Sequence, residues 1–143
     1  MRLYLDTSVL VSLFLRDDLT DRVLRWFGSV EDDLVVSDWS AAEFTSALGI
    51  RRRRGALDQS ERDQAEAALD GWLGRVERLE IGAPDFILAR QLMRTELTAL
   101  RTPDALHVAI ALRWGATLVT TDRQMSQAAE ALGLPVEDLS PHP

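Results

Sequence analysis

Four acidic residues hold the chemical potential of this sequence: Asp6, Glu43, Asp104 and Asp122. They are far apart along the chain, and each stands where a strand should end or near the start of an expected helix. Carboxylates gathered at one place bind hard cations such as Mg²⁺ or Mn²⁺, and such ions activate water for hydrolysis. The sequence therefore predicts a metal site if the fold brings the four acids together.

The remaining residues exclude several other chemistries. Lys and Cys are absent, and His107 and His142 are the only histidines. Without Lys there is no P-loop and no Schiff base, and without Cys there is no thiol nucleophile and no cysteine zinc site. Carboxylates are thus the only plentiful side chains for catalysis.

Length and composition predict one globular domain spanning residues 1–143. Hydrophobic residues make up 46% of the 143, enough for a sizeable core. No apolar run is long enough to span a bilayer, and the N-terminus does not read as a signal peptide. We therefore expect a cytoplasmic protein with no membrane partner. Its net charge of -7 argues against passive binding of nucleic acid, although Arg51–Arg54 form one dense positive cluster.

Short apolar segments alternate with helical ones. Strands are expected at residues 2–5, 34–37, 79–81, 117–120 and 134–136, and helices at 8–15, 20–27, 38–54, 60–78, 84–96, 105–114 and 123–132. This alternation predicts an α/β fold, in which right-handed crossovers join parallel strands and helices cover both faces. Ser60 and Thr102 are expected to cap helices, and residues 141–143 to form a frayed tail.

The expected topology places all four acids at one edge of the sheet. Asp6 and Asp122 directly follow strands, and the carboxyl ends of parallel strands share an edge. Asp104 lies near the start of a helix that would feed the strand 117–120, so it belongs to the same edge. Glu43 lies about one turn into the helix after 34–37, and its side chain leans back towards the helix start.

Each acid also has a simpler explanation. Asp6 and Asp122 could be N-caps, Asp104 could complement a helix dipole, and Glu43 could face solvent. Glu43, however, shares its helix face with apolar residues at helical spacing, namely Trp39, Ala47 and Ile50. An acid on an apolar stripe costs free energy without a partner, and a nearby Arg or a metal would provide one.

Four short motifs contain these acids: Leu5-Asp6-Thr7-Ser8, Ala42-Glu43-Phe44, Thr102-Pro103-Asp104-Ala105-Leu106-His107 and Thr120-Thr121-Asp122. Together, in this order, they resemble PIN-domain ribonucleases, and most closely the VapC-type toxins of VapBC toxin–antitoxin pairs. The resemblance spans Leu3 to about Leu139. It implies a three-layer α/β/α PIN-like fold with a central, mainly parallel sheet.

The resemblance also implies an activity and its partners. The family hydrolyses RNA phosphodiesters with Mg²⁺ or Mn²⁺, and one or two ions would fit here. Its toxins are usually silenced by a cognate antitoxin protein and commonly form homodimers. Asp6, Glu43, Asp104 and Asp122 match the acidic metal-binding positions, whereas Ser8 and Thr120 match polar positions that orient the acids or bound water. Met125 departs from the pattern, since many relatives have an aromatic residue there.

Within this family, distinct roles are expected for the individual residues. Asp6 and Asp104 would be the main ligands, Asp122 would bind a second ion or act through water, and Glu43 would ligate or orient the attacking water. His107 would support or pack beneath the site, or else donate to a phosphate or act as an acid. Arg51, Arg52, Arg53 and Arg54 would guide RNA, or else form a solvated helix end favoured by the macrodipole.

The sequence is compatible with two competing functions. An aspartate-based phosphatase with Asp6 as nucleophile would need a second acid two residues later, where this chain has Ser8, and a lysine that it lacks. A non-catalytic PIN-like RNA-binding module is the other alternative. Degenerate members of that kind usually lose acids, and none is lost here.

Overall fold

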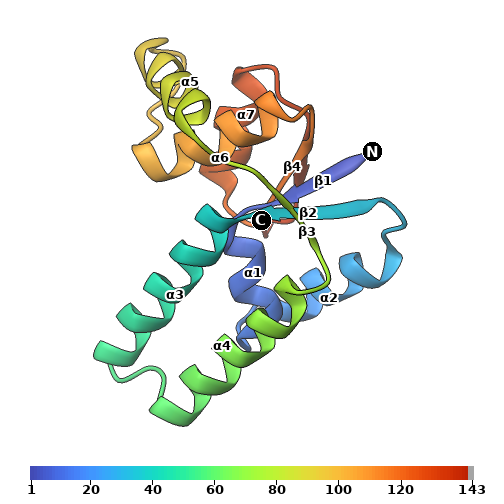
Figure 1. The fold of residues 1–143 in the computed structure, drawn as a ribbon, viewed down its shortest axis with the longest axis vertical. Helices are drawn as coiled ribbons and strands as arrows, with labels where there is room; N and C mark the ends of the chain where they lie inside the picture. Colours follow the sequence, from blue (N-terminus) through green and yellow to red (C-terminus); the bar gives the residue numbers. More distant parts are fainter. Residues whose placement is uncertain (142–143) are drawn as a thin grey trace.

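The fold is described by a computed structural model covering residues 1–141 (Figure 1). Its strands are β1 (Arg2–Leu5), β2 (Asp33–Ser37), β3 (Glu77–Leu79), β4 (Thr117–Thr120) and β5 (Val136–Asp138). Its helices are α1 (Thr7–Phe14), α2 (Thr20–Ser29), α3 (Asp38–Arg53), α4 (Gln59–Leu73), α5 (Ala83–Arg94), α6 (Thr102–Arg113) and α7 (Arg123–Ala131).

The strands form one parallel sheet in the order β3-β2-β1-β4-β5. The chain moves outward from β1 through β2 to β3, then crosses back to β4 and β5 on the other side of β1. Connections therefore leave β1 and β4 in opposite directions, which opens a crevice at the carboxyl ends of these two strands. In a parallel α/β sheet this is where ligands bind.

Alternation along the central strands sends successive side chains to two separate cores. Leu3 and Leu5 join one core with residues of α1, α2, α3 and α4. Tyr4 points the other way, into a core built largely from α5, α6 and α7. Figure 1 shows these two helical groups on opposite sides of the sheet. The predicted three-layer α/β/α fold with a parallel sheet is confirmed.

Helices α3 and α4 form an antiparallel hairpin that extends away from the sheet, which we call the arm (Figure 1). Its first helix begins at the sheet edge, where Ser37 caps it by accepting a hydrogen bond from the Ser40 amide. Arg51, Arg52 and Arg53 occupy its last turn, at the far end of the arm. Glu43 therefore lies near the sheet, and the arginine cluster lies at the tip.

Several predicted boundaries were wrong. Asp58, not Ser60, caps α4, because Asp58 and Glu61 form a reciprocal capping box. The helix also ends at Leu73 with Gly74 as its C-cap, so β3 starts earlier than expected. Glu77 and Arg78, which the sequence pattern assigned to the end of the helix, instead belong to a strand that pairs with β2.

Two further corrections concern the carboxyl half. Thr102 is not a cap: α6 begins after Arg101 without a side-chain cap, and the Thr102 hydroxyl lies against the Met93 sulfur. The last strand is Val136–Asp138, since Pro135 precedes the ladder and contributes only its carbonyl, which accepts from the Leu118 amide. Of the expected tail, residues 142 and 143 lie outside the described residues. No helix within residues 1–141 is long and apolar enough to cross a membrane.

An ion pair between a buried carboxylate on α5 and an exposed arginine on α6 was not anticipated from the sequence. The Asp85 side chain is fully buried, and it accepts from Arg113 Nε at 2.6 Å and Nη2 at 3.0 Å. It also accepts from the Gly82 amide at 2.9 Å. Because a buried carboxylate is tolerated only with such partners, this pair fixes α5 against α6 and so helps to place the start of α6.

Candidate active site

Asp6 sits at the carboxyl end of the central strand and caps α1. Its backbone amide donates to the Val119 carbonyl at 3.1 Å, which ties the residue to the end of β4. Its Oδ1 accepts from Ser8 Oγ at 2.6 Å and from the Val9 amide at 3.2 Å. Only 2% of Asp6 is exposed, and this burial raises the pKa of its carboxyl despite these hydrogen bonds. Asp6 is thus an N-cap and also a buried acid of the edge.

Ser8 and Thr120 connect Asp6 to the end of β4. Ser8 Oγ lies 3.4 Å from Thr120 Oγ1 and accepts from the Thr121 amide at 2.9 Å. Thr120 Oγ1 accepts from the Asp122 amide at 3.0 Å. The two hydroxyls thus link the ends of β1 and β4.

Asp122 begins α7, and it is exposed. Its Oδ1 accepts from the Gln124 amide at 2.9 Å and from the Met125 amide at 3.3 Å. These bonds fix the carboxylate at the mouth of the crevice between β1 and β4. Like Asp6, it serves as an N-cap and also presents a charge at the edge.

Glu43 is held by two donors from other parts of the fold. Its Oε1 accepts from Thr7 Oγ1 at 2.7 Å and from His107 Nε2 at 2.5 Å. Partial burial raises the pKa of the Glu43 carboxyl, but the bond and charge of His107 and the Thr7 hydroxyl outweigh this and lower it overall. The acid on the apolar stripe thus has a histidine as its partner, where the sequence suggested a nearby Arg or a metal.

Behind His107 runs a chain of buried hydrogen bonds. His107 is 1% exposed, and its Nδ1 lies 2.8 Å from the Tyr4 hydroxyl, which lies 2.7 Å from Ser37 Oγ. Burial raises the pKa of Tyr4, so the phenol keeps its proton. His107 Nε2 donates to Glu43, since an ionised carboxylate can only accept. Ser40 donates to the Leu5 carbonyl.

We call this series of hydrogen bonds, which runs from Ser37 through Tyr4 and His107 to Glu43, the Glu43 relay. Both ring nitrogens of His107 are occupied, and the ring is buried. His107 therefore has no ring nitrogen free to contact a phosphate, and its supporting role in the site stays a prediction. Sequence reasoning missed Tyr4 and Thr7. Their only signal was position, Thr7 beside Asp6 and Tyr4 on a core strand.

Asp104 lies in the first turn of α6 and is half-buried. Burial raises the pKa of its carboxyl, and the charge of Asp122 raises it further. His107 opposes this effect, while Glu43 and Asp6 add to it. The four acids are therefore close enough to influence one another, as the topology predicted. Within residues 1–141, no salt bridge neutralises Asp6, Asp104 or Asp122.

The acids do not form a ready-made ligand cage. Within the described chain, no three His, Asp or Glu side chains are placed to hold one ion together. Their chemistry nevertheless fits a hard cation, because Mg²⁺ commonly uses one or two carboxylates and completes its coordination with water. Asp6, Asp104 and Asp122 could supply such oxygens, and their mutual repulsion favours a cation between them. Glu43, engaged by the relay, is better placed beside the ion.

The chain is similar to known proteins over most of its length. The model of the PIN domain family matches residues 3–131. A relative from Mycobacterium tuberculosis, Ribonuclease VapC35, is 30% identical over 139 residues, which cover 94% of each chain.

Solved structures share the fold. A chain in the crystal structure of VapBC2 from Rickettsia felis, bound to a DNA fragment from its promoter, superposes with a TM-score of 0.70 at 19% identity, covering 96% of this chain and 98% of that one. Mycobacterium tuberculosis VapC20, described as a toxin that cleaves the sarcin–ricin loop, gives a TM-score of 0.70 at 20% identity, covering 88% of this chain and 94% of that one.

The Glu43 relay should contribute to stability as well as to position. Tyr4→Phe removes the hydroxyl and leaves His107 Nδ1 and Ser37 Oγ with a lost partner in a buried environment. We expect the free energy of unfolding, measured by urea denaturation, to fall by about 1–3 kcal/mol. Thr45→Val, which removes an exposed hydrogen bond to Glu66, is the control and should change it by less than about 0.5 kcal/mol. If both substitutions lowered the free energy of unfolding equally, the relay would not contribute specifically to stability.

Proposed function

Because the chain belongs to the PIN-domain family, among its VapC-type ribonucleases, we propose that it is a metal-dependent endoribonuclease. The observation that supports this best is the gathering of Asp6, Asp104 and Asp122 at the crevice between β1 and β4, with no salt bridge in the described residues to neutralise them. One or two Mg²⁺ or Mn²⁺ ions would bind there, and RNA phosphodiesters would be hydrolysed. Residues 1–143 would form a single nuclease domain.

Each acid would have a distinct task. When bound, the metal lowers the pKa of a coordinated water and offsets negative charge on the phosphate. Asp6 and Asp104 would hold it, with Asp6 fixed in direction by Ser8. Asp122, exposed at the mouth, would bind a second ion or act through water. Glu43 stays ionised through the relay and can accept a hydrogen bond from the attacking water.

The alternatives fare less well against this geometry. A phosphatase with Asp6 as nucleophile would need a second acid where this chain has Ser8, and a lysine that the chain lacks. A non-catalytic RNA-binding module would have no need for a buried relay that keeps Glu43 charged. Metal-dependent cleavage of a mixed RNA pool distinguishes this module from the proposed nuclease.

The partners proposed here follow the relatives. Chains of VapBC complexes share this fold, and one of them was solved with promoter DNA. We expect a cognate antitoxin to neutralise this protein, and we expect the protein to act as a homodimer. Co-purification with the product of a small neighbouring reading frame would test the first point, and sedimentation the second.

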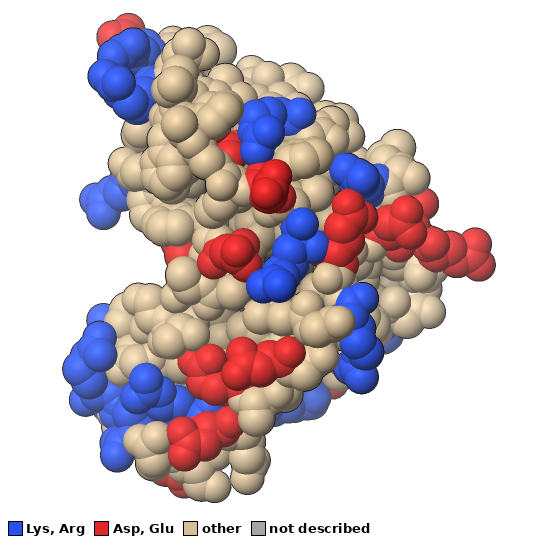
Figure 2. All heavy atoms as spheres, viewed as in Figure 1, with Lys and Arg blue, Asp and Glu red and all other residues tan. Residues whose placement is uncertain are grey.

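The arginine cluster Arg51–Arg54 would hold the RNA backbone. Figure 2 shows basic residues gathered over the end of the arm, with acidic residues beside them and towards its middle. Eight to eleven residues separate Glu43 from the cluster, which is roughly 12–17 Å along a helix. A strand crossing the acid edge could thus reach it within a few nucleotides. The macrodipole of α3 also favours arginines there, so the cluster requires its own test.

Removing one metal-binding acid should abolish cleavage without unfolding the protein. Asparagine keeps the shape and the capping ability of aspartate but binds hard cations poorly. We expect Asp6→Asn and Asp104→Asn to lose RNA cleavage while their circular dichroism spectra match the wild type. Asp63→Asn, an exposed acid near the tip of the arm, is the control and should stay active. Full activity in both edge variants would refute the assignment.

Divalent ions should stabilise the fold through this site. An ion that binds only the folded state raises stability by mass action, by about 2.7 kcal/mol at 100 times its dissociation constant. For a domain of this size that corresponds to a rise in melting temperature of roughly 5–10 °C with Mn²⁺. EDTA should abolish the rise, and Asp104→Asn should reduce it. Identical melting curves of the wild type in Mn²⁺ and in EDTA would rule out the site.

Replacing Arg52 and Arg53 by Gln should weaken RNA binding and leave Mn²⁺ affinity unchanged. Each phosphate contact removed should lower the salt dependence of single-strand binding by roughly 0.7 log units per log unit of salt. The control is the double replacement of Arg16 and Arg25, exposed arginines near α2, which alters net charge equally. If both double variants bind RNA with the same affinity and salt dependence, the cluster is a solvated helix end or serves a protein contact.

A further inference from the structure

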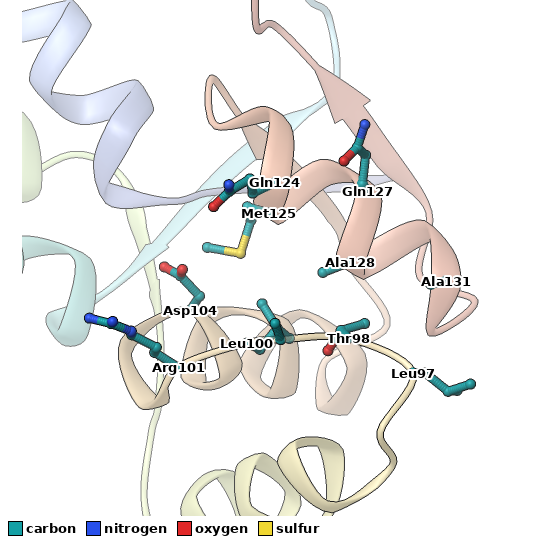
Figure 3. A pocket seen from close by; sticks show the side chains of 11 residues that line it. Leu97, Thr98, Leu100, Arg101, Asp104, Gln124, Met125, Gln127, Ala128 and Ala131 are labelled. Carbon is teal, nitrogen blue, oxygen red and sulfur yellow. The ribbon is translucent and has the colours of Figure 1, made fainter.

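A pocket adjoins the acid edge on the side opposite the arm. It has a volume of about 420 Å³ and lies between residues 97–101 and α7. Figure 3 shows that it ends at Asp104, whose carboxylate stands at its mouth. Ligand pockets in proteins typically begin at roughly 300 Å³, so this one is large enough for a small ring system with a substituent.

The walls of the pocket differ from the edge beside it. Met125, Leu100 and Ala128 form an apolar surface, and Met125 is only 2% exposed. In Figure 3 the Met125 thioether and the Leu100 side chain face the gap from opposite sides. Such a slot accepts a flat, largely apolar ring face.

Polar groups surround this apolar surface. Gln124 lies beside Met125, and Arg101 extends past Asp104 towards the edge (Figure 3). The Thr98 hydroxyl, also in the lining, is buried and has no hydrogen-bond partner within the described residues. An amide that both donates and accepts, together with an unsatisfied hydroxyl, is suited to a ring with polar edges. Arg101 is suited to an attached phosphate.

A nucleobase combines these features, with a flat face, polar edges and a linked phosphate. Single-stranded RNA is read by stacking its bases and by hydrogen bonds to their edges. We propose that this pocket binds the base of the nucleotide beside the cleaved phosphodiester and thereby sets the sequence that is cut. The proposal rests on the proposed ribonuclease function, because the pocket opens at Asp104. Leu100, Met125 and Ala128 would contact the ring face, and Gln124 its edge.

Binding of a base can be measured apart from catalysis. The chain has three methionines, and only Met125 lines the pocket, whereas Met1 lies against Thr117 at the opposite end of β4. The protein would be labelled with [methyl-¹³C]methionine and titrated in EDTA with adenosine, guanosine, cytidine or uridine. Nucleosides are used because, without a cation, the acids would repel a phosphate. Ribose is the control without a base.

The Met125 methyl signal should shift saturably with at least one nucleoside, while Met1 stays in place and ribose has no effect. No shift with any nucleoside, or an equal shift with ribose, would overturn the proposal. So would a Met125 signal that follows protein concentration instead of nucleoside, since a second copy of the chain would then cover the pocket. RNA cleavage by the wild type in Mn²⁺ is measured separately. Its absence would refute the proposed ribonuclease function, whatever the result of the nucleoside titration.

The second test concerns sequence preference. Gln124→Ala should weaken binding of the preferred nucleoside about tenfold and flatten the base preference beside the cut in a random RNA pool. Gln124 is exposed, so the substitution should leave the fold intact. Gln91→Ala, an exposed glutamine on α5, is the matched control and should keep the wild-type preference. Unchanged preference in Gln124→Ala would show that the pocket does not read the base.

Discussion

The central position of β1 is the constraint on which the rest of the site depends. Because β1 pairs with β2 on one side and β4 on the other, its carboxyl end lies where the crossover connections diverge. Asp6 follows that end directly, and Asp122 follows the end of β4. The helices that start or pack there, α3 and α6, then add Glu43 and Asp104. A different strand order would scatter the same four residues.

Gathering like charges costs free energy, and the fold offsets this cost for Glu43 but not for Asp104. Glu43 is stabilised as an anion by Thr7 and His107, and the relay behind it reaches Ser37 at the end of β2. Asp104, by contrast, has a raised pKa because burial and its acidic neighbours oppose its charge. One acid is therefore satisfied by the protein, whereas the other is left for a cation. This division would suit the edge to the metal ion proposed for it.

The acid edge lies between two surfaces of different character. The arm leads from Glu43 to a basic tip, which suits a phosphate backbone, and the pocket between residues 97–101 and α7 has an apolar surface with polar groups around it. Figure 2 shows the molecule hollowed between the arm and the helices on the other side of the sheet. Substrate contacts on both sides would place one phosphodiester at the edge, with affinity from the arm and selectivity from the pocket.

The sequence alone determined the alternation of strands and helices, the parallel sheet and the candidate acids, because these follow from apolar periodicity and from residues that end strands or open helices. It missed the cap at Asp58 and the end of α4 at Leu73, since helix boundaries there depend on a capping box and on pairing with β2. It named His107 but could not give its partners. Only the tertiary structure joined Tyr4, His107 and Glu43, and only it opened a pocket beside Asp104, because such contacts bring together side chains up to about a hundred residues apart.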